Sequence, residues 1–202
     1  MRRIVAVVSL CAVVTGCGTS PPSHFYTLSP TAARPASDSE KSAATSSNLS
    51  VSVGPVSIPS VVDRPEIVLS TGTNEVRLDE FNRWASPLQD NLARVIAENL
   101  AVMLRTPRVS MFPQTLSADA GYRVAIEVLR FHSAPGKSAT LDVVWIVRAK
   151  DGKTQTGRTN VVEKVPDNSN SFDALAAAHS RAVARLSQDI ADAVLALDSA
   201  AR

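Results

Sequence analysis

Residues 122–165 read YRVAIEVLRFHSAPGKSATLDVVWIVRAKDGKTQTGRTNVVEKV, and this stretch decides the fold of the chain. Apolar and polar residues alternate in two runs along it, which is the period-two pattern of a β-strand. After the second run, Asp151-Gly152 favours a tight hairpin turn that leads into a further strand. Val144 and Ile146 give the second run another apolar face, so we expect that strand to be central and covered on both sides.

Two amphipathic helices flank this stretch in the sequence. Ser86 is the predicted N-cap of the first, with Pro87 at the first helical position and Gln89 completing a capping box. The second helix spans about residues 172–197. Each helix has one apolar stripe at helical spacing. The stripes comprise Leu88, Leu92, Val95, Ile96, Leu100 and Met103 in the first helix, and Leu175, His179, Val183, Leu186, Ile190, Val194 and Leu197 in the second.

Four further segments have the residue pattern of strands and lie around the first helix. Gly54-Pro55 interrupts the first of them, which predicts a bulge or an edge strand. The order of strands, helix, strands and helix predicts an α+β fold, with a mixed β-sheet packed by two long helices. We expect one folded domain over residues 49–202, because a chain of this size can bury a sufficient core. The four segments are residues 49–58, 67–69, 75–78 and 109–112.

The N-terminus has the three-part organisation of a lipoprotein signal peptide over residues 1–16. Two arginines precede an apolar run, Ile4 to Val14, that is too short for a transmembrane helix. The run leads into Val14-Thr15-Gly16-Cys17, which resembles a bacterial lipobox: small residues admit the signal peptidase, and the cysteine takes the lipid. The alternative is an ordinary secretory signal followed by a chance cysteine. No cysteine follows Cys17, so it has no disulfide partner in the chain, and this favours lipidation.

Cys17 is therefore the predicted lipidation site and the N-terminus of the mature protein. The resemblance to processed lipoproteins implies a diacylglyceryl group and an N-acyl chain on this residue, and two or more chains give stable attachment. The second mature residue is Gly18 rather than Asp. By resemblance to Gram-negative sorting rules, this favours the outer membrane, with the domain on the periplasmic face. Residues 17–48 read as a lipidated N-terminus and a flexible tether that holds the domain off the membrane, with a short docking strand near residues 24–28.

The composition and the absence of catalytic motifs favour a binding protein over an enzyme. Removing the two arginines of the signal peptide from 21 basic residues leaves 19 against 19 acidic ones, so the mature chain is formally neutral and nucleic acid is not an expected partner. The histidines are His24, His132 and His179, none of them with ligands at metal-binding spacing; His179 is predicted to be a core histidine. No nucleophile elbow or phosphate-binding loop occurs. We expect no catalytic residue, no metal site and no cofactor apart from the acyl chains.

One segment ahead of the first helix contains a candidate partner interface. Asp63-Arg64-Pro65 precedes a short strand, and Arg83-Trp84 comes just before the helix. Arg and Trp are favoured anchors of protein interfaces. The structural interpretation is that Trp84 staples the start of the helix while Asp63 and Arg64 fix a turn. Both interpretations can hold together.

Several short motifs follow the lipobox in a set order. They are Phe25-Tyr26-Thr27-Leu28, Val53-Gly54-Pro55-Val56 with Ile58-Pro59, Asp63-Arg64-Pro65 with Ile67-Val68, and Arg83-Trp84 with Pro87-Leu88. Together with the lipobox and the first amphipathic helix, this order resembles the ABC-type transport auxiliary lipoprotein family (PqiC/YmbA-like) over nearly the whole mature chain.

The resemblance implies a non-enzymatic accessory role. Members of this family are outer-membrane lipoproteins that work with a periplasm-spanning MCE-domain protein and with an inner-membrane permease and ATPase. Together these proteins move lipids or other apolar molecules between the membranes and support envelope integrity. By similarity, the chain would be the outer-membrane docking subunit, and a ring-like homo-oligomer is compatible with that role. The alternatives are a structural envelope lipoprotein without a transport role and a periplasmic hydrolase with a cryptic site.

Overall fold

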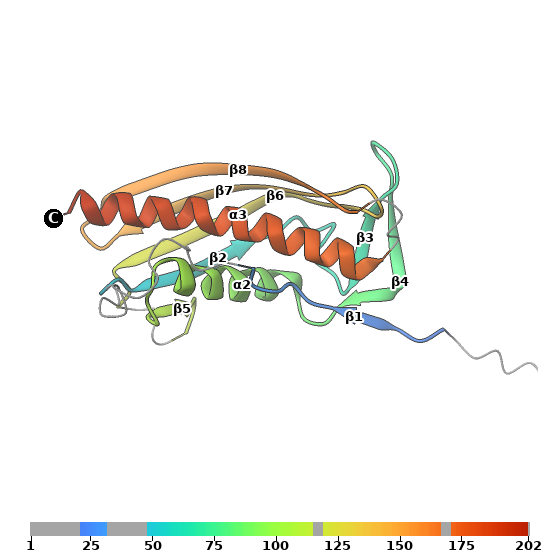
Figure 1. Ribbon diagram of the computed structural model, residues 1–202, viewed down its shortest axis with the longest axis horizontal. Coiled ribbons are helices and arrows are strands. Elements are labelled where there is room, and N and C mark those ends of the chain that lie inside the picture. The colour runs from blue at the N-terminus through green and yellow to red at the C-terminus, as the bar shows by residue number, and fades with distance from the viewer. Residues whose placement is uncertain (1–20, 32–47, 115–118, 167–170, 202) are drawn as a thin grey trace, which may run out of the picture.

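The computed structural model describes residues 21–31, 48–114, 119–166 and 171–201. The predicted signal peptide, Cys17 and most of the predicted tether lie outside these ranges. Within them, the chain forms one mixed eight-stranded sheet and two long helices (Figure 1), so the predicted α+β fold is confirmed. No helix in these ranges combines the length and apolar character needed to cross a bilayer. The elements are β1 (His24–Tyr26), β2 (Val51–Ser57), β3 (Glu66–Ser70), β4 (Val76–Trp84), α2 (Leu88–Met103), β5 (Val109–Met111), β6 (Tyr122–Ala134), β7 (Ser138–Ala149), β8 (Thr154–Lys164) and α3 (Phe172–Ser199).

β6 organises the sheet because it pairs with three other strands. β7 runs antiparallel to it along its whole length. On its other side, β2 pairs in parallel with the first part of β6, and β3 meets its far part at the single pair Leu69↔Ser133. β7 and β8 form the predicted hairpin, with Gly152 at φ +90° in the turn. The sheet therefore ends in β8 on one side and divides on the other into β2–β5 and β3–β4–β1.

β2 contains the predicted bulge. Its register with β6 shifts between Val53 and Val56, around Gly54-Pro55. Gly54 has a φ of +118°, and a Cβ added there would lie 3.1 Å from the Cβ of Phe112, so both the backbone and the space favour glycine. β2 is not an edge strand, because β5 pairs with its other side.

Both helices pack on the same face of the sheet. Figure 1 shows α3 running across β6, β7 and β8, with α2 beside it over β2. Their predicted apolar stripes face the core, and between the helices Asn99 Nδ2 donates to Ser187 Oγ at 3.2 Å. β7 is central, as predicted, but the expectation that both of its faces are covered is wrong. Val144 on the outer face is 37% exposed, because α2 and α3 both lie on the inner face.

α2 begins without the predicted capping box. Pro87 occupies the N-cap position, and no side chain caps the first turn. The helix begins one residue later than predicted, so its N-cap is Pro87, whose side chain has no hydrogen-bond acceptor. In the preceding segment, Ala85 N donates to Tyr26 O at 2.8 Å and extends the pairing of β1 with β4 almost to the helix. Ser86 is exposed. The capping roles predicted for Ser86 and Gln89 are therefore wrong.

Residues 21–31, in the first part of the predicted tether, pack on the domain. β1 lies within the residues expected to form a short strand and pairs in parallel with β4. Leu28 is fully buried, and Ser29 N donates to Ser180 Oγ of α3 at 3.1 Å. Residues 32–47, which complete the predicted tether, lie outside the described residues, and the stand-off role of the tether stays a prediction.

Candidate interaction surface

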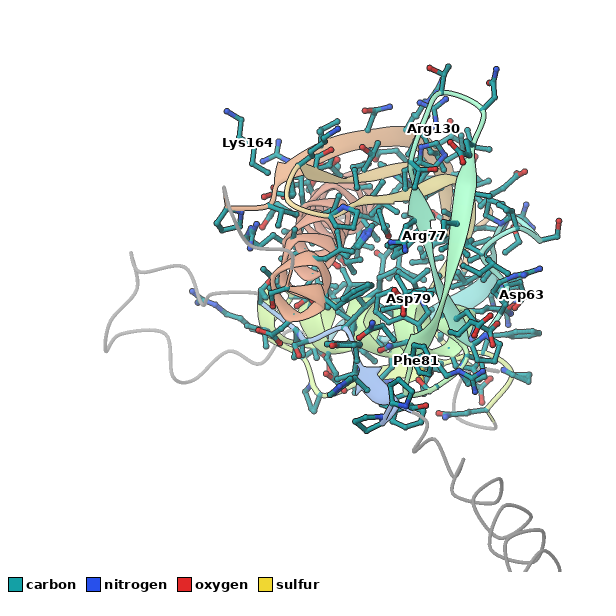
Figure 2. The ribbon with its side chains drawn as sticks, turned by 90° about the vertical axis from the view of Figure 1, so that its right-hand side faces the viewer. Asp63, Arg77, Asp79, Phe81, Arg130 and Lys164 are labelled. Atoms are coloured by element: carbon teal, nitrogen blue, oxygen red, sulfur yellow. The ribbon has the colours of Figure 1, made fainter. Side chains whose placement is uncertain are left out.

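The exposed turn between β2 and β3 contains three of the five residues of the predicted interface. Asp63, Arg64 and Pro65 are all exposed, and Figure 2 shows Asp63 at the edge of the molecule. Backbone hydrogen bonds shape the turn: Val62 N donates to Pro59 O at 3.0 Å, and Arg64 N donates to Val62 O at 2.9 Å. The turn therefore presents an anion and a cation in sequence on a backbone of defined shape.

Trp84 belongs to the core rather than to the exposed surface. It is 5% exposed, and its ring meets those of Phe131 and His179 edge-on, with centroids 6.1 and 6.4 Å away. Its backbone N–H donates to Pro65 O at 2.8 Å, which ties the exposed turn to the end of β4. A structural role accounts for this position, and the indole is not available as an exposed interface anchor.

Arg83 points away from the core that holds its neighbour Trp84. Arg83 Nη2 pairs with Glu66 Oε1 at 2.8 Å, and the two residues are register partners of β4 and β3. Both side chains are partly exposed, so the pair is worth at most about 1 kcal/mol. The structure therefore brings Arg83 and the exposed turn to one region through β3 and β4, and it separates Trp84 from them by directing the indole inward.

β4 has a bulge of three residues that the sequence did not predict. Glu66 pairs with Arg83 and Ile67 pairs with Asp79, so residues 80–82 have no register partner in β3. Asp79 Oδ1 accepts hydrogen bonds from Phe81 N at 3.2 Å and from Asn82 N at 2.9 Å. These bonds satisfy backbone donors that the bulge removes from the ladder. The bulge leaves the aromatic side chain of Phe81 38% exposed.

An open depression of about 640 Å³ lies beside this bulge. It joins the chain just before β1 to β3 and β4, and Figure 2 shows Phe81 next to β1 at this end of the molecule. The surface combines apolar side chains with a few charged ones. Its lining consists of Pro21, Ser23, Glu66, Leu78, Glu80, Phe81 and Arg83.

The outer face of the sheet has a second apolar surface. Two depressions of about 290 and 380 Å³ lie there, and Pro55, Ala125 and Ile146 line both of them. The sequence did not predict this surface, because the strand that became β7 was expected to be covered on both sides.

Elsewhere on β7, two hydrogen bonds from Arg158, at 2.8 and 2.7 Å, lower the pKa of the Asp142 carboxyl and keep it ionised.

His179 is a buried core residue, as predicted. Its Nε2 lies 2.8 Å from Ser133 Oγ, and its ring stacks on that of Phe131 with centroids 3.9 Å apart. Burial lowers the pKa of His179 to about 3, because the interior disfavours the charged imidazolium. His179 is therefore neutral at any pH at which the protein is expected to work. His24 and His132 are both exposed and lie on different strands.

Acidification is expected to destabilise the protein through His179. The unfolded histidine titrates near pH 6.5, whereas the folded one titrates near pH 3, so only the unfolded state gains a proton between these values. This contribution to stability is complete above pH 6.5 and is lost as the pH falls toward 3. Between pH 7 and pH 5 the loss is about 2 kcal/mol. Urea unfolding at a series of pH values measures it.

The variant His179→Gln is the control for this pH dependence. Glutamine can still bond to Ser133 but does not titrate, so its free energy of unfolding is expected to change less between pH 7 and pH 5. Equal pH slopes for the wild type and His179→Gln would show that another group carries the effect.

The fold and these surfaces define a class of protein: a single α+β domain whose surface features are an ordered turn, a strand bulge and shallow depressions. Among the described residues, no group of three or more His, Cys, Asp or Glu side chains is placed to hold a metal ion. The chain belongs to the family described as ABC-type transport auxiliary lipoprotein component, which matches residues 26–191, so the family resemblance is confirmed. This is a family of transport auxiliary proteins and not a known enzyme family, and its lipoprotein character implies membrane association.

Solved structures share the fold, and two of them show the following similarity to this chain. One, a crystal structure of an uncharacterized protein, has a TM-score of 0.68 and 19% sequence identity, covering 86% of this chain and 99% of its own. The other is protein XCC0632 from Xanthomonas campestris, with a TM-score of 0.63, 18% identity, and coverage of 83% and 92%. At these identities the likeness shows the fold alone. None of the curated protein sequences compared with the chain matches it.

Proposed function

We propose that this protein is the outer-membrane docking subunit of an ABC/MCE-type intermembrane lipid transport system and that it supports envelope integrity. The observation that carries the proposal is the family match, which spans residues 26–191 and so includes almost all of the described domain. The energy for transport comes from the ATPase of the system. The contribution of this chain is to hold a partner at the correct membrane.

The proposed anchor is Cys17, acylated by a diacylglyceryl group and an N-acyl chain. The lipobox Val14-Thr15-Gly16-Cys17 supports acylation, and Gly18 supports sorting to the outer membrane. The domain then lies on the periplasmic face, where a protein that spans the periplasm from the inner membrane can reach it. Two or more acyl chains make such an anchor effectively permanent.

The proposed contact with the MCE-domain partner is the turn Asp63-Arg64-Pro65. Its side chains are exposed, whereas its backbone is held by the bond from Trp84 N to Pro65 O. A turn that is ordered before binding loses little conformational entropy when a partner binds. Arg64 supplies the kind of side chain that anchors interfaces. The hydrogen bond from Trp84 N and the Arg83–Glu66 ion pair hold the C-terminal end of the turn against β4.

Charge reversal at Arg64 tests this contact. Arg64→Glu is expected to lower co-purification of the MCE-domain partner from solubilised membranes about tenfold, because a favourable charge contact becomes a repulsive one. Lys164→Glu makes a matched charge change on β8, and Figure 2 shows Lys164 on the opposite side of the molecule from Asp63. This control variant is expected to retain the partner at the wild-type level.

The other outcomes distinguish the contact from the function. Wild-type recovery of the partner with Arg64→Glu would rule out the turn as the contact, while the transport assignment would stand. If the wild-type protein brings down no MCE-domain protein, permease or ATPase, the transport assignment itself is wrong. The structural envelope lipoprotein would then be the better description.

A further inference from the structure

A compact apolar patch lies at the end of the domain where the described chain begins. We define the anchor-side patch as Pro21, Phe25, Leu78 and Phe81. Phe25, Leu78 and Phe81 are 64%, 42% and 38% exposed, which is unusual for large apolar side chains on one small surface. Pro21, Leu78 and Phe81 line the same open depression.

Strand register places Phe25 on the same surface. β1 and β4 pair in parallel, with Phe25 opposite Arg83, and register partners in neighbouring strands point to the same face of a sheet. Arg83 lines the depression with Leu78 and Phe81, so Phe25 extends the patch from β4 onto β1. The two strands thus present one apolar surface.

The patch is rigidly held. Asp79 Oδ1 fixes the bulge that exposes Phe81, as described above. β1 is fastened to β4 by its ladder and by Tyr26 Oη, which donates to Asn82 Oδ1 at 2.9 Å. Leu28 then enters the core. Phe25, Leu78 and Phe81 therefore move with the domain.

The chain leaves little room between the patch and the proposed anchor. Pro21 follows Cys17 by four positions in the sequence, and a fully extended chain advances at most about 3.6 Å per residue. The Cα atom of Pro21 can therefore lie no more than about 14 Å from that of Cys17. With acyl chains on Cys17 inserted in a bilayer, the patch is held within reach of the headgroup region.

We propose that the anchor-side patch rests on the lipid surface that holds Cys17 and so orients the whole domain on the membrane. This proposal rests on the acylation of Cys17 in the proposed function. Aromatic side chains favour the boundary between headgroups and acyl chains, and burial of apolar area stabilises the contact. Figure 1 shows that β1 and β4 lie at the opposite end of the molecule from the C-terminus of α3, so that end of α3 points away from the membrane.

The charges around the patch indicate what kind of lipid contact it makes. The charged side chains that line the depression are Glu66, Glu80 and Arg83, and Glu66 and Arg83 pair with each other. Within the described part of the chain Glu80 pairs with no cation, so the lining of the depression has no cationic surplus to attract anionic lipids. We therefore infer an apolar contact that depends little on salt or on the fraction of anionic lipid.

Single-cysteine labelling of the intact lipoprotein tests the orientation. Cys17 is the only cysteine after the signal peptide, and acylation blocks its thiol, so an introduced cysteine is the only reactive one. Phe25→Cys and Phe81→Cys are each labelled with an environment-sensitive fluorophore and reconstituted in vesicles of phosphatidylethanolamine and phosphatidylglycerol. Lipids with a shallow nitroxide quencher are then added. The control is Leu195→Cys near the C-terminal end of α3, which the proposal directs away from the membrane, because Leu195 is 46% exposed and so resembles Leu78 and Phe81 in exposure.

We expect several-fold stronger quenching at positions 25 and 81 than at position 195, with little change on adding salt. Quenching at both positions no stronger than at position 195 would overturn the proposal. A blue shift without quenching by lipid would also overturn it, because the patch would then contact protein, such as a second copy of the chain. Each labelled variant is first checked for a native thermal transition. Because two positions are labelled, the result does not depend on a single misfolded variant.

Mass spectrometry of the same preparation separates this proposal from the anchor on which it rests. If Cys17 is acylated but the probes are not quenched, only the orientation proposal fails. If Cys17 carries no acyl chains, the anchor fails and the orientation proposal fails with it.

Discussion

Replacing Cys17 by serine is expected to release the mature protein from the membrane fraction into the soluble one. Serine offers no thiol for the diacylglyceryl group, so both the diacylglyceryl and the N-acyl chain are lost. Each buried CH₂ of an acyl chain contributes about 0.8 kcal/mol to membrane binding, which makes this the largest effect of any single substitution proposed for the chain. No helix among the described residues could take over as a membrane span.

The comparison requires proteins whose signal peptide is removed whether residue 17 is cysteine or serine. Both the wild-type mature sequence and its Cys17→Ser variant are therefore also expressed behind a general secretory signal in place of residues 1–16. With the native signal, Cys11→Ser is the matched control, because Cys11 lies within the predicted signal peptide and is expected to take no lipid. Fractionation and the mass of the N-terminal peptide are the measurements. If Cys17→Ser behind the general signal still fractionates with the membrane, as the wild type with its native signal does, the lipobox prediction is wrong.

Trp84→Ala is expected to lower the free energy of unfolding by about 3–5 kcal/mol, which is the usual cost of truncating a buried tryptophan. The indole fills the space between β4, Phe131 of β6 and His179 of α3, with ring centroids 6.1 and 6.4 Å from those two rings. Its loss leaves a cavity under the strand that receives β1 and supports the exposed turn. Since single domains are stable by only about 5–15 kcal/mol, a loss of this size leaves a marginal fold.

Urea unfolding of unlipidated protein measures this effect, with both variants made in the Cys17→Ser background. Arg83→Ala is the matched control, because Arg83 is the neighbouring residue on the opposite face and forms a partly exposed ion pair with Glu66 at 2.8 Å. Its loss is expected to cost at most about 1 kcal/mol. A Trp84→Ala variant as stable as Arg83→Ala would contradict the core role assigned to the indole.

The contrast between Arg83 and Trp84 shows how far sequence reasoning reaches into the candidate site. The sequence singled out both residues, because Arg and Trp anchor interfaces, but composition could not say which of two adjacent side chains faces solvent. That choice is made by the pairing of β4 with β1 and β3 and by the helix packed behind it. A one-residue change of register would exchange the two faces. The turn at Asp63-Arg64-Pro65 could be predicted from the sequence, because turn-forming residues such as Asp and Pro are recognisable within a short stretch of chain.

The anchor-side patch could not be found in the same way. Residues 75–78 were expected to be a short strand, whereas β4 continues to Trp84 through a bulge around Phe81. A bulge breaks the alternation of exposed and buried residues, so the period-two pattern ends where the strand does not. Asp79, two residues before Phe81, is the one local signal, since aspartate side chains accept hydrogen bonds from backbone N–H groups that follow them.

The sequence by itself determined what depends on local periodicity and local chemistry. The alternation in residues 122–165, the apolar stripes of the two helices and the lipobox ending at Cys17 each lie within a short stretch, and they predicted the α+β class and the proposed anchor. Only the tertiary structure decided what depends on contacts between distant segments. It placed both helices on one face of the sheet and chose β4 as the strand with which β1 pairs. Such pairings depend on the packing of the whole core, so they cannot be predicted from the residue pattern of a single segment.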